Sequence, residues 1–202
     1  YCEAIQKTYS GGEQFFRCRI SKDRKQFEPK EIDAPPKGKS ADGRANARGI
    51  VTLYLGDTEK TAIHETRTGL YDHVCIGTFE LKSPIIVIDF KKINEISPFQ
   101  DGIIDDIAEL AINKKHLKQI DYEMGRVMRK SDDVLNYLPT QYIADFVKSI
   151  VSEEYPEQYA FQGIEFRSVM NPEGFNLAIF TPECFDVIDI KTKQISRVSY
   201  EW

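Results

Sequence analysis

The fold is decided by a loop, a strand and a helix that follow one another in residues 43–67, which read GRANARGIVTLYLGDTEKTAIHETR. Residues 50–55 are apolar and include β-branched and aromatic side chains, which is typical of a buried strand. Gly56 and Asp57 are turn residues, and we expect Asp57 to cap a helix over residues 59–67. The stretch therefore predicts a strand–turn–helix unit.

Further strands are predicted on both sides of this unit, because short β-branched and aromatic runs recur between turn residues. The predicted strands cover residues 13–20, 50–55, 74–81, 85–90, 163–167, 176–180, 186–190 and 194–200. Apolar residues at helical spacing predict one or two helices within 103–128 and a third from Pro139 to about Glu154. Strands before and after a helical middle indicate an α/β or α+β domain with a mixed β-sheet core.

The composition is that of an ordinary globular domain. The 202 residues carry 27 basic and 32 acidic side chains, a formal net charge of −5, and 41% are hydrophobic. This length fits a single domain over residues 1–202. The acidic balance argues against a general nucleic-acid binder. No apolar run is long enough to span a membrane and no signal peptide is evident, so we expect a cytoplasmic protein, with a segment upstream of Tyr1 because the chain does not begin with Met.

Several familiar sites are excluded by spacing. The four cysteines form no C-x-x-C pair, which argues against zinc, and Cys18 and Cys75 are expected to pack as small apolar residues. The sequence GKS at 38–40 lacks the first glycine and the preceding strand of a P-loop, and His64-Glu65 lacks the second histidine of a zincin. The aspartates at 101, 105 and 106 are interpreted as a solvated helix start.

A basic loop precedes the strand at 50–55. It carries Lys37, Lys39, Arg44 and Arg48 within twelve residues, opposed by Asp42. Paired arginines can hold a pyrophosphate bidentately, so this loop is a candidate anion site. The alternative is a solvated loop that balances neighbouring acids.

Glu65 and Ser168 are the other residues whose positions suggest chemistry. Glu65 follows Ala62 at a same-face spacing, so we expect it to face inward, although a solvated helix carboxylate is an equal alternative. His64 lies about 100° away around the helix and is left out of the site. Ser168 ends a predicted strand with no histidine placed to activate it, so a hydrolase triad is poorly supported.

Taken together, these motifs resemble the RES domain family. The matching residues are Gly43-Arg44-x-Asn46-x-x-Gly49, Leu53-Tyr54, Thr61-Ala62-x-x-Glu65, Gly163-Ile164-x-x-x-Ser168 and Gly174-x-Asn176-Leu177-x-x-Phe180. Supporting matches are Phe79-x-Leu81, Ile86-x-Ile88-Asp89 and Tyr137-Leu138-Pro139-Thr140-Gln141. The family often has an aromatic residue after the arginine, where this chain has Ala45. The long Pro-rich lead-in is similar to larger RES proteins with an upstream extension.

The resemblance implies a bacterial toxin that degrades NAD+ by hydrolysis or phosphorolysis, without a metal, on a fold similar to ADP-ribosyltransferases. The implied partner is an Xre-type antitoxin or an upstream regulatory domain. The implied catalytic residues are Arg44, Tyr54, Glu65 and Ser168. The implied NAD+-binding residues are Arg17, Arg19, Arg44, Asn46, Arg48, Tyr54, Ser168 and Asn176. Two alternatives stay open: transfer of ADP-ribose to a macromolecule, and a non-catalytic domain that senses a nucleotide.

Overall fold

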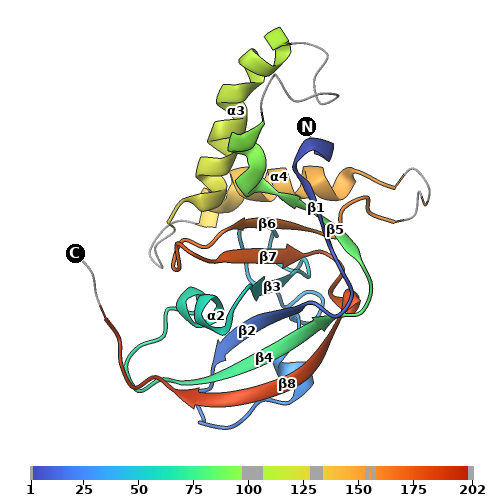
Figure 1. Cartoon of the computed structure of the whole chain (residues 1–202). Coiled ribbons are helices and arrows are strands. Elements are labelled where there is room, and N and C mark those ends of the chain that lie inside the picture. The colour runs from blue at the N-terminus through green and yellow to red at the C-terminus, as the bar shows by residue number, and fades with distance from the viewer. Residues whose placement is uncertain (1, 97–106, 128–133, 153–154, 156–157, 200–202) are drawn as a thin grey trace.

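The strands assemble into one mixed sheet in the computed structural model, which describes residues 2–96, 107–127, 134–152, 155 and 158–199 (Figure 1). In the described residues the sheet has eight strands in the order β1-β5-β6-β7-β3-β2-β4-β8. The strands are β1 (Gln6–Tyr9), β2 (Gln14–Ile20), β3 (Leu53–Gly56), β4 (His73–Leu81), β5 (Ile85–Asp89), β6 (Gly163–Arg167), β7 (Phe175–Ile179) and β8 (Phe185–Gln194). The strands β5 and β6 pair in parallel and the other registered pairs are antiparallel. The predicted mixed sheet is confirmed.

The helices divide between the two ends of this sheet. They are α1 (Pro29–Ile32), α2 (Glu59–Glu65), α3 (Ile107–Gly125) and α4 (Leu138–Ser149), with 3₁₀ turns η1 (Glu3–Ile5), η2 (Phe90–Glu95), η3 (Val134–Tyr137) and η4 (Pro182–Cys184). Figure 1 shows α3 and α4 together beside β6, and α2 beside β3 and β2. The buried side chains form two apolar clusters, one that α3 and α4 cover and one between β3, β7, β5 and α1.

Strand alternation assigns residues of β3 and β7 to these two clusters. Leu55 and Leu177 pack in the second cluster, while Tyr54 and Ala178 pack against or within the first. Because successive side chains point to opposite faces, the face that holds Tyr54 also holds Asn176. This alternation places polar residues next to the helical end of the molecule.

Several boundary predictions are wrong. The strand predicted over residues 50–55 covers Leu53–Gly56, and the helix predicted over 59–67 ends at Glu65. The N-cap of α2 is Thr58, whose extended backbone lets its side chain accept a hydrogen bond from the Thr61 N–H, so Asp57 precedes the cap. The helix α4 ends at Ser149 rather than near Glu154, because Ile150 is extended. The last two predicted strands are one strand, β8, which pairs with β4 along its length and ends at Gln194. Residues 195–199 are irregular. The aspartates at 101, 105 and 106 lie outside the described residues.

The strands β2 and β3 are the point at which the sheet loosens. Along β2 and β4 seven residue pairs are in register, from Gln14–Glu80 to Ile20–Val74. Between β2 and β3 the described residues give one registered pair, Phe16 with Gly56. Gly56 is the last residue of β3, so the two strands separate from this pair back toward Leu53, where the described residues give no registered partner on β2.

Candidate active site

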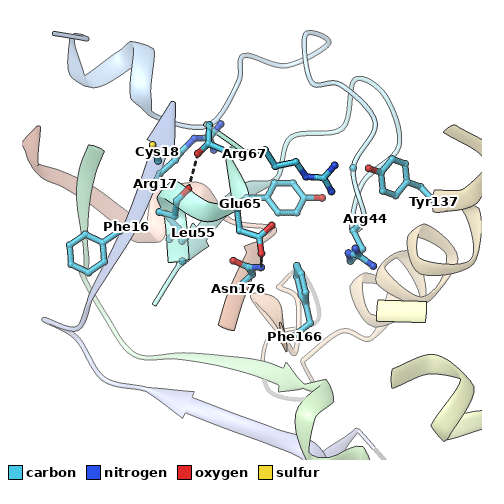
Figure 2. A pocket seen from close by; sticks show the side chains of 15 residues that line it. Phe16, Arg17, Cys18, Arg44, Leu55, Glu65, Arg67, Tyr137, Phe166 and Asn176 are labelled. Carbon is cyan, nitrogen blue, oxygen red and sulfur yellow. Dashed lines mark hydrogen bonds between the residues drawn. The ribbon is translucent and has the colours of Figure 1, made fainter. Parts of the chain in front are cut away.

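A cavity of about 470 Å³ opens where β2 and β3 separate. It lies among α2, the loop before β3, and the strands β6 and β7 (Figure 2). Its lining residues are Phe16, Arg17, Cys18, Gly43, Arg44, Tyr54, Leu55, Gly56, Ala62, Glu65, Thr66, Arg67, Tyr137, Phe166 and Asn176. This volume is typical of a small-molecule site.

Glu65 ends α2 and presents its carboxylate to the cavity. Its Oε1 accepts hydrogen bonds from Ser168 Oγ at 2.6 Å and from Asn176 Nδ2 at 2.7 Å. Figure 2 shows Glu65 and Asn176 side by side, with Phe166 nearby. Glu65 lines the open cavity and is exposed, so it matches the solvated alternative rather than the buried carboxylate. Ser168 is buried behind it and does not line the cavity.

Arg44 approaches the cavity from the loop before β3. Its Nη1 and Nη2 donate hydrogen bonds to the carbonyl oxygens of Glu123 and Arg126, both at 2.8 Å, at the end of α3. A helix C-terminus favours a cation there, because its last carbonyls lack partners. The guanidinium lies 5.8 Å from the ring centroid of Phe166. Burial lowers the pKa of Arg44, yet an arginine remains charged at neutral pH.

The loop that carries Arg44 is built around the hydroxyl of Tyr54. This hydroxyl accepts a hydrogen bond from the Ala45 N–H at 2.8 Å and donates one to Asn46 Oδ1 at 2.7 Å. Asn46 Nδ2 donates to two loop carbonyls at 2.9 and 3.0 Å, and Asn46 does not line the cavity. A Cβ on Gly43 would lie 2.6 Å from the Tyr54 hydroxyl oxygen, so only glycine fits. The G-R-x-N sequence and Tyr54 thus form one structural unit.

We expect Tyr54→Phe to destabilise the protein by about 2 kcal/mol, because it leaves the Ala45 N–H and Asn46 Oδ1 without their partner. Urea unfolding followed by circular dichroism measures this. Tyr142→Phe is the matched control, since Tyr142 is 77% exposed, and it should change the free energy of unfolding by less than about 0.5 kcal/mol. Equal effects of the two substitutions would contradict the role given to the Tyr54 hydroxyl.

The helix α4 holds the same loop from the other side. Gln141 Nε2 donates to the carbonyls of Gly43 at 3.0 Å and Asn46 at 2.9 Å. Lys148 Nζ donates to the carbonyl of Ala45 at 3.2 Å, and burial lowers the pKa of this ammonium. The loop is therefore fixed by α4 and β3 together, and Arg44 inherits its position from both.

Of the two arginines predicted on β2, Arg17 lines the cavity and Arg19 does not. Arg17 Nη1 is buried and has no hydrogen-bond partner in the described part of the chain. Burial, and then the charge of Arg19, lower the pKa of Arg17 to about 10. Arg19 is exposed, donates to the carbonyl of Glu31 and stacks 5.2 Å from the Phe27 ring centroid. Arg48 is exposed and outside the cavity lining, so its contact with a ligand stays a prediction.

Sequence reasoning missed several cavity residues, among them Arg67, Tyr137 and Phe166. Arg67 follows the end of α2 and has a positive φ of 51°, a conformation that non-glycine residues rarely adopt. Tyr137 is the first residue of the Tyr-Leu-Pro-Thr-Gln motif. This motif supports membership of the family but does not predict that Tyr137 lines the cavity. Phe166 lies beside Glu165 on β6, and only strand alternation could have assigned it to the cavity face.

A comparison with protein families decides where this site belongs. The model of the RES domain matches residues 15–202. The chain belongs to the RES domain family. The match begins at the second residue of β2, continues through β8 and contains all the residues that line the cavity. The family is linked to NAD+-related toxin activity. A comparison with curated proteins finds no significant match.

The remaining expectations concern His64, two cysteines, metal ligands and membrane spans. His64 is exposed, its Nδ1 lies 3.0 Å from the carbonyl oxygen of Met170, and it does not line the cavity. Cys75 is buried as expected, whereas Cys18 is half-buried, lines the cavity and has a pKa raised by burial. In the described residues no group of three or more His, Cys, Asp or Glu could hold a metal ion. None of the helices described is both long and apolar enough to cross a membrane.

Proposed function

We propose that this RES domain degrades NAD+ by cleaving the bond between nicotinamide and ribose, with water or inorganic phosphate as the acceptor. The observation that carries the proposal is the charge pattern of the cavity. Among the described lining residues, three are arginines and one, Glu65, is a carboxylate. NAD+ carries negative charge on its pyrophosphate and positive charge on its nicotinamide ring, so the pattern suits both ends of the ligand.

The anionic part of NAD+ is assigned to Arg17 and Arg44. Both arginines line the same cavity as the Tyr54 ring. Within the described residues Arg17 has a buried donor without a partner, and Arg44 uses two of its five N–H groups at the end of α3. A phosphate oxygen would complete the hydrogen bonding of both residues.

The cationic part is assigned to Glu65. Cleavage breaks the bond from ribose C1′ to the ring nitrogen, and the bonding electrons leave with nicotinamide, which becomes neutral. Positive charge then develops on the ribose, and the fixed carboxylate of Glu65 stabilises it. Water or phosphate oxygen next bonds to C1′, and water loses its proton to the carboxylate or to solvent. The rings of Tyr54, Tyr137 and Phe166 supply apolar surface for the planar parts of the ligand.

The test is chromatography of the products after NAD+ is incubated with the purified domain, with and without inorganic phosphate. We expect free nicotinamide in both cases, together with ADP-ribose from hydrolysis or its 1-phosphate from phosphorolysis. Nicotinamide release with adenine label on a macromolecule would replace the proposal by ADP-ribosyl transfer. Binding of NAD+ seen as thermal stabilisation without any product would indicate a sensing domain instead.

The toxin role is part of the same proposal. Expression of the domain in bacteria is expected to lower cytoplasmic NAD+ and stop growth, whereas the Glu65→Gln variant at equal abundance should do neither. An Xre-type antitoxin or an upstream regulatory domain would be the partner that holds the activity in check. Growth arrest by both proteins would show that depletion of NAD+ is not its cause.

A further inference from the structure

A chain of polar contacts leaves α2 at one residue and returns to it at another. It starts at Glu65, whose Oε1 accepts a hydrogen bond from the Ser168 hydroxyl. Ser168 Oγ in turn accepts the backbone N–H of Asn171 at 3.0 Å. Asn171 Nδ2 donates to Thr61 Oγ1 at 2.8 Å, one helical turn before Glu65. With the contact between His64 Nδ1 and the Met170 carbonyl, the turn over 168–171 is therefore fixed to the same helix at three points.

The part of this chain formed by Asn171 and Thr61 is tightly packed. Thr61 and Asn171 are buried, with exposed fractions of 0% and 5%. A Cβ on Gly174 would lie 2.2 Å from Thr61 Oγ1 and 2.7 Å from Asn171 Nδ2. The Thr61 hydroxyl also lies 2.9 Å from the hydroxyl of Thr58, the N-cap of α2. The turn is thus packed on the first part of α2 with no room for an added methyl group.

This geometry limits what Ser168 can do. A serine hydroxyl can donate one hydrogen bond, and the Ser168 hydroxyl donates its hydrogen bond to Glu65. The residue is buried and does not line the cavity. Asn176 supplies a second donor to the same oxygen from β7. With Oε1 held by two donors, the carboxylate cannot rotate freely, and its Oε2 is the oxygen left for a ligand.

We propose that Asn171 and Asn176 are positioning residues, which act on the reaction by fixing the direction of the Glu65 carboxylate. The inference rests on the proposed NAD+ cleavage, because it assigns the direction of the group that stabilises the ribose cation. Asn176 acts on Glu65 directly. Asn171 acts through Ser168, whose hydroxyl it holds with a backbone N–H while its side chain anchors the turn to Thr61.

Steady-state kinetics of nicotinamide release tests the proposal. Asn171→Ala and Asn176→Ala should each lower kcat about 10-fold or more and leave KM within about 3-fold, because ordering of a catalytic group is felt mainly in the transition state. In a Ser168→Ala background, Asn171→Ala should lower kcat by less than about 2-fold, since its route to Glu65 is already lost. A KM rise with unchanged kcat, or full additivity with Ser168→Ala, would overturn the positioning role.

Two further variants separate positioning from simple loss of folding. Thr61→Ser keeps the acceptor for Asn171 and should retain at least about half of the wild-type kcat, whereas Thr61→Val removes the acceptor and should lower kcat as Asn171→Ala does. Circular dichroism and melting temperature identify any variant that does not fold. The melting temperatures of Thr61→Val, Asn171→Ala and their double variant should be non-additive whether or not NAD+ is the substrate. Lack of turnover by the wild-type protein would reject the proposed function, and additive melting shifts would reject the Thr61–Asn171 link.

Discussion

Replacing Arg17 by Met is expected to raise the KM for NAD+ by about 100-fold while it increases the melting temperature by about 2–4 °C. The two effects have one cause. The Arg17 Nη1 is buried and has no partner among the residues that the structure describes, so the protein without ligand loses stability that a bound phosphate would restore. A methionine of similar length removes that penalty and also removes the anion contact. Michaelis–Menten kinetics and thermal denaturation measure the two effects on one sample.

Arg19→Met is the matched control for this prediction. Arg19 lies two residues further along β2, outside the cavity, where it contacts the carbonyl of Glu31 and the ring of Phe27. We expect its KM for NAD+ to stay within about 2-fold of wild type, because an exposed side chain away from the ligand contributes little to binding. If Arg19→Met weakened NAD+ as much as Arg17→Met, the effect would be one of overall charge rather than of a buried contact.

Glu65→Gln is expected to lower kcat about 1,000-fold, the size of effect seen when a fixed group that stabilises transition-state charge is removed. The glutamine amide oxygen can still accept the hydrogen bonds of Ser168 and Asn176, so the fold of the site is kept. ADP-ribose, which lacks the nicotinamide cation, should still bind with an affinity within about 5-fold of wild type. Isothermal calorimetry measures the binding and nicotinamide release measures the rate.

The same substitution at Glu59 controls for the chemistry of the change. Glu59 begins α2, is paired with Lys191 and Lys193 at the surface, and lies outside the cavity lining. Glu59→Gln should keep kcat within about 2-fold, since surface ion pairs contribute little. Turnover by Glu65→Gln near that of Glu59→Gln would mean that the carboxylate of Glu65 is not needed for the reaction.

Much of the sheet could be predicted because its strands carry local signals. The runs at 13–20, 74–81 and 163–167 match β2, β4 and β6 to within a residue. The short strand β1 was missed because Gln6–Tyr9 is largely polar and gains its place by pairing with β5. The strand β8 was divided in two because residues 191–193 are polar, yet pairing with the full length of β4 keeps them extended. Both errors arise from long-range pairing, which overrides local propensity.

Spacing and motifs predicted which residues gather near the site. They did not predict which of these residues line the cavity and which form hydrogen bonds within the protein. Arg17 and Arg19 share a strand face, but Arg17 lines the cavity whereas Arg19 contacts the carbonyl of Glu31 and the ring of Phe27. Asn46 and Ser168 belong to the motifs, yet their side chains form hydrogen bonds within the protein. Asn46 accepts one from Tyr54, and Ser168 donates one to Glu65. A motif identifies residues that a site requires, whereas tertiary contacts decide which of them face the cavity.

The single registered pair between β2 and β3 has a mechanical consequence. The two parts of the sheet, one ending at β3 and the other at β2, share little backbone bonding where they meet. Residues from both strands line the cavity. A dinucleotide bound there would contact both parts of the sheet and so hold together two parts that share few backbone hydrogen bonds. Amide hydrogen exchange should then slow along this seam on both sides at once when NAD+ or ADP-ribose binds. Ligand binding and the opening of the sheet between β2 and β3 are then thermodynamically linked: a ligand that binds the closed sheet makes opening less favourable.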